Sequence, residues 1–92
     1  MTSEVRPAVH WFAGQMEQKL QAHDHKGGWE NTLPERLMCL LVKEVGELSS
    51  GLEAWRMDDQ WANAVIAECA DVANFTMMIA DLVRQKGNTH DE

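Results

Sequence analysis

Residues 34–56, PERLMCLLVKEVGELSSGLEAWR, carry the clearest structural pattern in the chain. The apolar residues of this stretch return every three or four positions, which is the repeat of an amphipathic α-helix. They are Leu37, Leu41, Val45, Leu48, Leu52 and Trp55. Just ahead, Thr32-Leu33-Pro34-Glu35 has the T-x-x-E spacing of a capping box, with a proline in the first turn. We therefore predict a long helix that begins at this capping box and ends near Arg56.

Similar spacing predicts one helix on each side of this stretch. The earlier helix covers about residues 7–23 and stops in the polar, glycine-containing loop HDHKGGW at residues 23–29. The later helix covers about residues 59–86, after a short turn at residues 57–59 whose aspartates can cap it. We expect Gly87-Asn88 to end the later helix. This helix is apolar on two faces, which predicts burial against both the core and another subunit.

Length and composition favour one small all-α domain. The 92 residues suit a single domain covering 1–92, with residues 1–6 and 88–92 frayed. Residues that favour strands are few and scattered, and Tyr is absent. A chain of this length buries only about 60–65% of its unfolded surface. We therefore expect a bundle with three main helices per chain that is completed by oligomerisation.

Charge and cysteine content limit the partners and the compartment. The chain has 15 acidic and 8 basic residues, so duplex nucleic acid, which is bound by clustered Lys and Arg, is not an expected partner. No apolar run approaches the ~20 residues that span a bilayer, and the N-terminus lacks a signal-peptide hydrophobic region, so no membrane partner is expected. Cys39 and Cys69 match no metal or redox signature. We expect both to be buried, reduced thiols in a cytoplasmic protein.

Two acidic pairs lie on or beside the apolar faces of the predicted helices. On a helical wheel of about 100° per residue, Glu44 lies at the margin of the first apolar stripe, with Glu47 beside it. Glu68 lies inside the stripe of the later helix, and Asp71 lies at its edge. Four converging carboxylates would repel one another without a cation, and Mg²⁺ prefers oxygen ligands. The pattern therefore predicts a metal site between the two helices, with surface ion pairs to nearby bases as the alternative.

These acidic pairs resemble the motifs of the MazG-like nucleotide pyrophosphohydrolases, the all-α NTP pyrophosphatase superfamily. That family has ExxE on one helix and ExxD on the next, which here read Glu44-Val45-Gly46-Glu47 and Glu68-Cys69-Ala70-Asp71. The flanking sequences LLVKEVGELSSGLEAW and AVIAECADVANFTMMIADL are similar to the family's two motif helices. The loop HDHKGGW resembles that of short, single-domain members of phage type. The likeness covers about residues 23–82.

The resemblance implies a Mg²⁺-dependent hydrolase, with Mn²⁺ as a substitute, that converts a ribo- or deoxynucleoside triphosphate and water into the monophosphate and pyrophosphate. The implied metal ligands are Glu44, Glu47, Glu68 and Asp71. One of these carboxylates, Glu47 by preference and otherwise Glu44, would orient or deprotonate the attacking water. Asn74, one turn beyond the second motif, would lie near the sugar. The resemblance also implies a homodimer or homotetramer. Many members carry an extra acid where this chain has Lys43, which leaves the number of metal ions open.

Other polar residues suggest weaker hypotheses. Lys26 and the two following glycines could approach a phosphate while Trp29 stacks on a base, although a simple helix-ending loop has the same pattern. His23 and His25 form H-x-H, but no nearby Cys or His completes a zinc site. A competing function is a non-catalytic helical binding or dimerisation module that retains the fold. Stabilisation by Mg²⁺ would distinguish the enzyme from such a module.

Overall fold

The computed structural model describes residues 4–91, which form an all-helical chain. Its elements are α1 (Pro7–Ala22), α2 (Pro34–Met57) and α3 (Ala62–Asp91), with short 3-10 turns η1 (Asp24–Lys26) and η2 (Asp59–Trp61) between them. No strand occurs among residues 4–91. The prediction of an all-α fold with three main helices is therefore confirmed. Residues 1–3 and 92, which belong to the segments expected to be frayed, lie outside the described residues.

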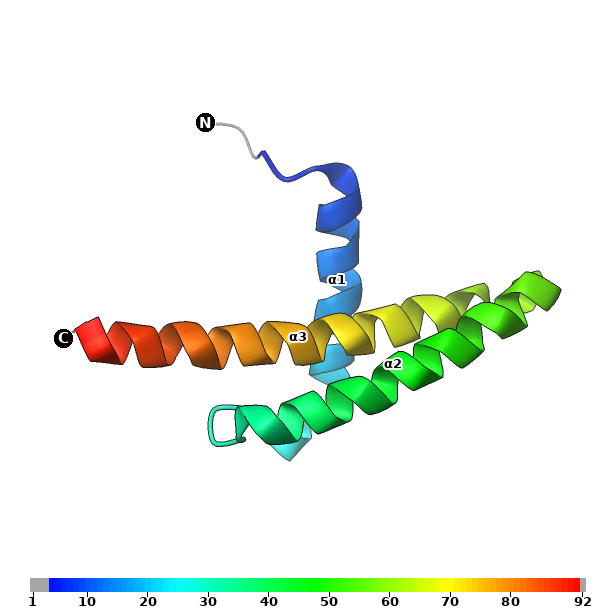
Figure 1. Ribbon diagram of the computed structural model, residues 1–92. Coiled ribbons are helices and arrows are strands. Elements are labelled where there is room, and N and C mark those ends of the chain that lie inside the picture. Colours follow the sequence, from blue (N-terminus) through cyan, green and yellow to red (C-terminus); the bar gives the residue numbers. More distant parts are fainter. Residues whose placement is uncertain (1–3, 92) are drawn as a thin grey trace.

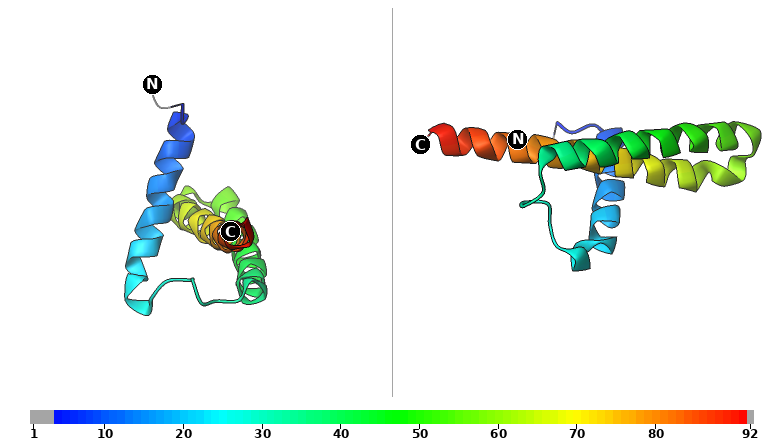
Figure 2. Two further views of the ribbon diagram at one scale, coloured as in Figure 1. Left: turned by 90° about the vertical axis from the view of Figure 1, so that its left-hand side faces the viewer. Right: turned by 60° about the horizontal axis from the view of Figure 1, so that its bottom comes forward.

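Helices α2 and α3 lie side by side as an antiparallel hairpin, and α1 runs across it (Figures 1 and 2). The last turns of α3 project beyond the first turn of α2 (Figure 1). The molecule measures 53 × 39 × 23 Å along its principal axes. Within the described residues, none of the helices combines the length and the apolar character that crossing a bilayer requires. The hairpin thus brings the middle of α2, which carries Glu44 and Glu47, against the first third of α3, which carries Glu68 and Asp71.

The start of α2 differs from the predicted capping box. The residue before the helix is Leu33, and no side chain caps the helix end. The prediction that Thr32 is the cap is wrong because Pro34 holds Leu33 in an extended conformation, with φ −70° and ψ 138°, and so fixes the boundary one residue later. The backbone N–H of Thr32 instead donates to the carbonyl oxygen of Trp29 within the preceding turn.

Both ends of α3 also differ from prediction. The side chain of Asp58 accepts from the backbone N–H of Gln60 at 3.0 Å, so an aspartate of this turn does act as a cap, but it caps η2 and α3 begins only at Ala62. Gly87 does not end the helix, because α3 continues to Asp91. Among the described residues, Gly27 is the glycine with a positive φ, at 89°, whereas the usual glycine-ended helix needs such a conformation at the residue just after its last turn.

The hydrophobic core of a single chain is small. The buried apolar side chains in the described range are Leu37, 3% exposed, and Ala70, 0% exposed. The chain has an accessible surface of 7161 Å², whereas a compact monomer of 10.4 kDa would have about 5,400 Å². Its radius of gyration is 15.4 Å, against about 12 Å for a compact domain of this length. One chain therefore leaves apolar surface in water that a compact fold would bury.

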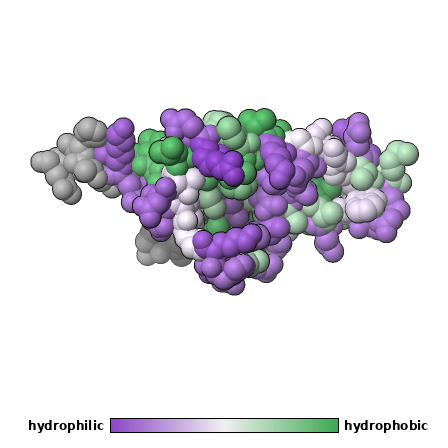
Figure 3. All heavy atoms as spheres, turned by 90° about the horizontal axis from the view of Figure 1, so that it is seen from below, coloured by the Kyte–Doolittle hydropathy of each residue, from purple (hydrophilic) through white to green (hydrophobic). Residues whose placement is uncertain are grey.

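Much of that apolar surface belongs to α2. Five of its apolar side chains are more than one-third exposed and follow one another at steps of three, four or seven residues: Met38, Val42, Val45, Leu52 and Trp55. We call this set the α2 outer stripe. Hydrophobic side chains also reach the surface between hydrophilic ones on the face that Figure 3 shows. Because α3 covers one side of α2 only, Cys39 is exposed, and the prediction that it is a buried thiol is wrong.

Candidate metal centre

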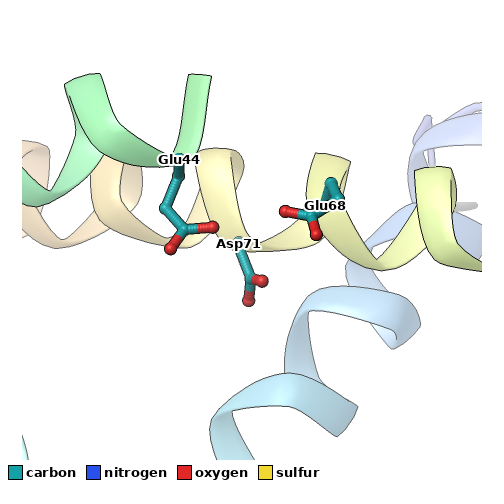
Figure 4. A group of neighbouring side chains, drawn as sticks. All are labelled: Glu44, Glu68 and Asp71. Carbon is teal, nitrogen blue, oxygen red and sulfur yellow. The ribbon is translucent and has the colours of Figure 1, made fainter. Parts of the chain in front are cut away.

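Three of the four predicted carboxylates come together where α2 packs against α3. Glu44 extends from the middle of α2, and Glu68 and Asp71 extend from successive turns of α3 (Figure 4). One oxygen from each of the three side chains lies within 4.8 Å of the corresponding oxygens of the other two. We call Glu44, Glu68 and Asp71 the carboxylate cluster. Its spacing allows all three groups to contact a single cation.

Two oxygens of the carboxylate cluster are buried without compensation. The Oε1 atoms of Glu44 and Glu68 are shielded from solvent, and neither has a hydrogen-bond partner among the described residues. A buried carboxylate oxygen without a partner is costly because it has lost its hydration shell. A cation bound between these oxygens would remove that cost. The donor set of three carboxylates therefore fits a hard divalent ion.

The electrostatics of the cluster agree with this geometry. Burial raises the pKa of Glu44, and the carboxylates of Glu47, Asp71 and Glu68 raise it further, whereas the ammonium of Lys43 opposes the shift. Burial also raises the pKa of Glu68, and the carboxylates of Glu47 and Asp71 add to the shift, whereas the ammonium of Lys19 and then a hydrogen bond with the Glu44 side chain oppose it. Without a cation, each group therefore resists ionisation more than an exposed glutamate does. A divalent ion would reverse both shifts by favouring the charged forms.

Asn74 lies beside the cluster and shares its environment. Its side chain is 5% exposed, and its Nδ2 donates to the backbone carbonyl of Met16 at 3.1 Å, which links α3 to α1. Its Oδ1 is buried and has no partner among the described residues. A cavity of about 190 Å³ is lined by Asn74 together with Glu44 and Asp71. The cavity therefore offers a buried, unpaired acceptor next to the carboxylates.

Glu47 does not join the carboxylate cluster. Its side chain is 44% exposed and lies 3.9 Å from the ammonium of Lys43, measured between Oε2 and Nζ. The two pairs of the sequence motif are thus not equivalent in space, since three of the four acids converge and the fourth faces solvent with Lys43. Glu47 still raises the pKa of Glu44 and Glu68, so its negative charge acts on the cluster.

The loop residues predicted to bind substrate line a second cavity, of about 510 Å³, next to the first. Lys26, Gly27, Gly28 and Trp29 form part of its wall, and both cavities are lined by His23 and Phe75. The indole of Trp29 is held in place because its Nε1 donates to Asp81 at 3.0 Å. The loop and the carboxylate cluster therefore border one continuous region of the molecule. Among the described residues, neither His23 nor His25 joins the carboxylate cluster.

Two residues at the site were not predicted from the sequence. Lys19 on α1 places its Nζ 3.4 Å from Oδ1 of Asp71. Asp81 on α3 accepts from Trp29 and from the Nε of Arg84 at 2.8 Å. In the sequence, Lys19 lies next to the helix face that carries Met16 and Leu20, which indicates only weakly that its side chain lies near the core. Its partner depends on how α1 crosses the hairpin, which the spacing does not indicate.

In comparisons with protein-family models, curated proteins and solved structures, none matches this chain.

Proposed function

We propose that this protein is a nucleoside triphosphate pyrophosphohydrolase that uses Mg²⁺, or Mn²⁺ in its place, held by Glu44, Glu68 and Asp71. The observation that carries the proposal is the carboxylate cluster, whose ligand oxygens lie within 4.8 Å of one another while two of its oxygens are buried without partners. The ExxE and ExxD motifs that supply the cluster, together with their resemblance to the MazG-like family, suggest the reaction. Its products would be a nucleoside monophosphate and pyrophosphate.

Each part of the site has a task in this proposal. When bound, a divalent cation would neutralise the triphosphate and lower the pKa of a water molecule. Glu44, Glu68 and Asp71 would hold the cation, and Glu47, which faces solvent at the edge of the cluster, is the candidate base for the attacking water. Asn74 would direct its unpaired Oδ1 toward a sugar hydroxyl in the adjoining cavity. Lys26 and Trp29 would contact phosphate and base from the loop cavity.

The test is pyrophosphate release from a panel of ribo- and deoxynucleoside triphosphates, with Mg²⁺ and with a chelator. We expect metal-dependent release of pyrophosphate and of the matching monophosphate. Glu68→Gln should abolish turnover while leaving the helical circular dichroism spectrum unchanged. Glu53→Gln, which changes an exposed glutamate on the same hairpin, is the matched control and should retain activity. Full activity in Glu68→Gln would contradict the metal assignment.

The proposed enzyme is a homo-oligomer in which a second copy covers the α2 outer stripe. The stripe has the three- and four-residue spacing with which helices pack against each other. The chain exposes about 1,800 Å² more surface than a compact monomer of its mass, and a standard interface buries about 800 Å² per partner. The excess is thus large enough for a stable interface between identical chains.

The exposed α2 outer stripe also favours a second candidate function, a helical binding module without catalysis. Such a module would bind a partner helix through the stripe and would have no use for a buried acidic cluster. It would show no pyrophosphate release from any nucleotide, and its thermal midpoint would not respond to Mg²⁺ or Mn²⁺.

A further inference from the structure

Lys19 is a cation that contacts the carboxylate cluster from outside the hairpin. It extends from α1, and its Nζ lies 3.4 Å from Oδ1 of Asp71. The two side chains are 33% and 26% exposed, respectively, so solvent reaches the contact. A partly exposed ion pair contributes little to stability. The position of Lys19 therefore calls for an explanation other than holding α1 against α3.

The same side chain lies between two cavities of different chemistry. On one side is the 190 Å³ cavity with Glu44, Asp71 and the unpaired Asn74. On the other side, Lys19 lines a cleft of about 450 Å³ between α1 and α3 whose polar side chains are the carboxamides of Gln15, Gln18 and Asn63. No acidic residue is among the described side chains that line this cleft. The ammonium can therefore move away from Asp71 without meeting another carboxylate in the cleft.

Metal binding would bring two cations, the metal ion and the Lys19 ammonium, to the one carboxylate of Asp71. A divalent ion at the cluster would use an oxygen of Asp71, the group that Lys19 already contacts. The two cations would repel each other at this short distance. The lysine side chain is long and flexible, and its ammonium binds phosphate as a compact point charge. When the ammonium leaves Asp71, it loses its negatively charged partner. An incoming polyphosphate would take the place of that partner.

We propose that Lys19 is a phosphate-binding residue that leaves Asp71 when a divalent cation occupies the carboxylate cluster and then contacts the polyphosphate of the ligand. This inference rests on the proposed function, because it requires a metal at Glu44, Glu68 and Asp71. It assigns two opposite effects to one side chain. Lys19 weakens the binding of the metal alone and strengthens the binding of the anion that arrives with the metal.

The test compares wild type with Lys19→Met, which keeps an unbranched side chain but removes the charge, and with Lys19→Arg. Lys86→Met is the control for the loss of one lysine charge, since Lys86 is exposed and lies on the last turns of α3, outside the carboxylate cluster. Titration calorimetry measures two affinities: Mn²⁺ alone, and inorganic pyrophosphate in the presence of Mg²⁺. Circular dichroism and thermal melts verify that each variant is folded.

We expect Lys19→Met to bind Mn²⁺ several-fold more tightly than wild type and pyrophosphate about tenfold more weakly, the size of one charge-assisted contact. Lys19→Arg should restore most of the pyrophosphate affinity, and Lys86→Met should leave both affinities within about twofold of wild type. A structural role alone would lower both affinities together, and that result would overturn the inference. Unchanged pyrophosphate affinity in Lys19→Met would overturn the role of Lys19 while leaving the metal site intact. If wild type binds no Mn²⁺, the proposed function fails and this inference fails with it.

Discussion

The indole Nε1 of Trp29 donates a 3.0 Å hydrogen bond to Oδ2 of Asp81 and so ties the loop after α1 to the C-terminal half of α3. Asp81 is in turn held by Arg84, whose Nε lies 2.8 Å from Oδ1. The side chain of Asp81 is only 15% exposed, whereas that of Arg84 is 73% exposed. Since Trp29 forms part of the wall of the loop cavity, this bond fixes the shape of the region next to the carboxylate cluster.

Replacing Asp81 by Ala should release the loop. We expect faster hydrogen exchange at the Trp29 indole N–H and in the backbone of the loop, because the acceptor is gone, while exchange in the middle of α2 remains unchanged. Nuclear magnetic resonance with ¹⁵N-labelled protein measures both. Arg84→Ala is the control, since it removes the exposed neighbour and leaves the acceptor for the indole in place. Equal protection of the indole in Asp81→Ala and wild type would contradict the assigned role.

The contribution of Asp81 should also depend on pH. The hydrogen bond from Arg84, followed by that from Trp29, lowers the pKa of Asp81 below its ordinary value of 3.8. A lowered pKa means that the ionised carboxylate stabilises the folded state above that value and that this contribution is lost as the pH falls through the folded pKa. The difference in thermal midpoint between wild type and Asp81→Ala should therefore be constant near neutral pH and shrink only below about pH 3.8.

Leu37 should be the most sensitive large side chain of the core. It is 3% exposed, and its truncation to Ala is expected to cost about 2–4 kcal/mol. In a domain of this size, each kcal/mol lowers the melting temperature by about 4–8 °C. Met57, the last residue of α2, is 88% exposed and lies outside the α2 outer stripe, so Met57→Ala should change the stability far less. Calorimetric melts of both variants at one protein concentration would test the contrast, and equal losses would contradict it.

These residues also show how much could be predicted from the sequence. The repeat of Leu37 and Leu41 predicted a helix within one or two residues of the observed α2, and helical spacing brought Glu44, Glu68 and Asp71 toward one side. Periodicity identifies an apolar face, but which neighbour covers that face is decided by tertiary packing. Val45 is consequently 48% exposed, although it belongs to the same repeat as the buried Leu37.

The mispredicted details have local or long-range causes. The expected cap at Thr32 failed because the effect of Pro34 on the preceding residue was stronger than the side-chain signal. The contact of Lys19 with Asp71 joins two helices that are not consecutive, so its partner follows from the crossing of α1 over the hairpin. Glu47 shares a motif with Glu44, yet at 44% exposure it faces Lys43, because a three-residue step turns a helix by about 60° short of a full turn.

Neutralising Glu44 should stabilise the protein in the absence of metal. Burial first, and the neighbouring carboxylates second, raise the pKa of Glu44 above its ordinary value of 4.5. The native state therefore holds this proton more tightly than the unfolded chain, and it loses stability as the pH rises from about 4.5 through the folded pKa. In a chelator at pH 7, Glu44→Gln should melt at a higher temperature than wild type, and the difference should shrink as the pH falls through the folded pKa toward 4.5.

Adding Mg²⁺ should reverse that order. Wild type gains stability from the bound ion through linkage, whereas Glu44→Gln has lost one of the three ligands and gains less. Differential scanning fluorimetry across a Mg²⁺ series measures both midpoints, and Glu53→Gln serves as the control for the loss of one acidic charge. A wild type that already melts above Glu44→Gln in chelator at neutral pH would show that the buried carboxylates are not a source of strain.

The α2 outer stripe should be the surface through which two chains associate. Val42 lies in the stripe and is 64% exposed, while Val83 on α3 lies outside it and is 62% exposed. If a second copy covers the stripe, Val42→Lys places a charge inside the interface and should shift the protein to monomers, because an unpaired buried charge is strongly unfavourable. Val83→Lys makes the same chemical change at matched exposure and should leave the assembly intact. Sedimentation equilibrium of the two variants gives the molar masses, and equal masses would show that the stripe is not where the chains meet.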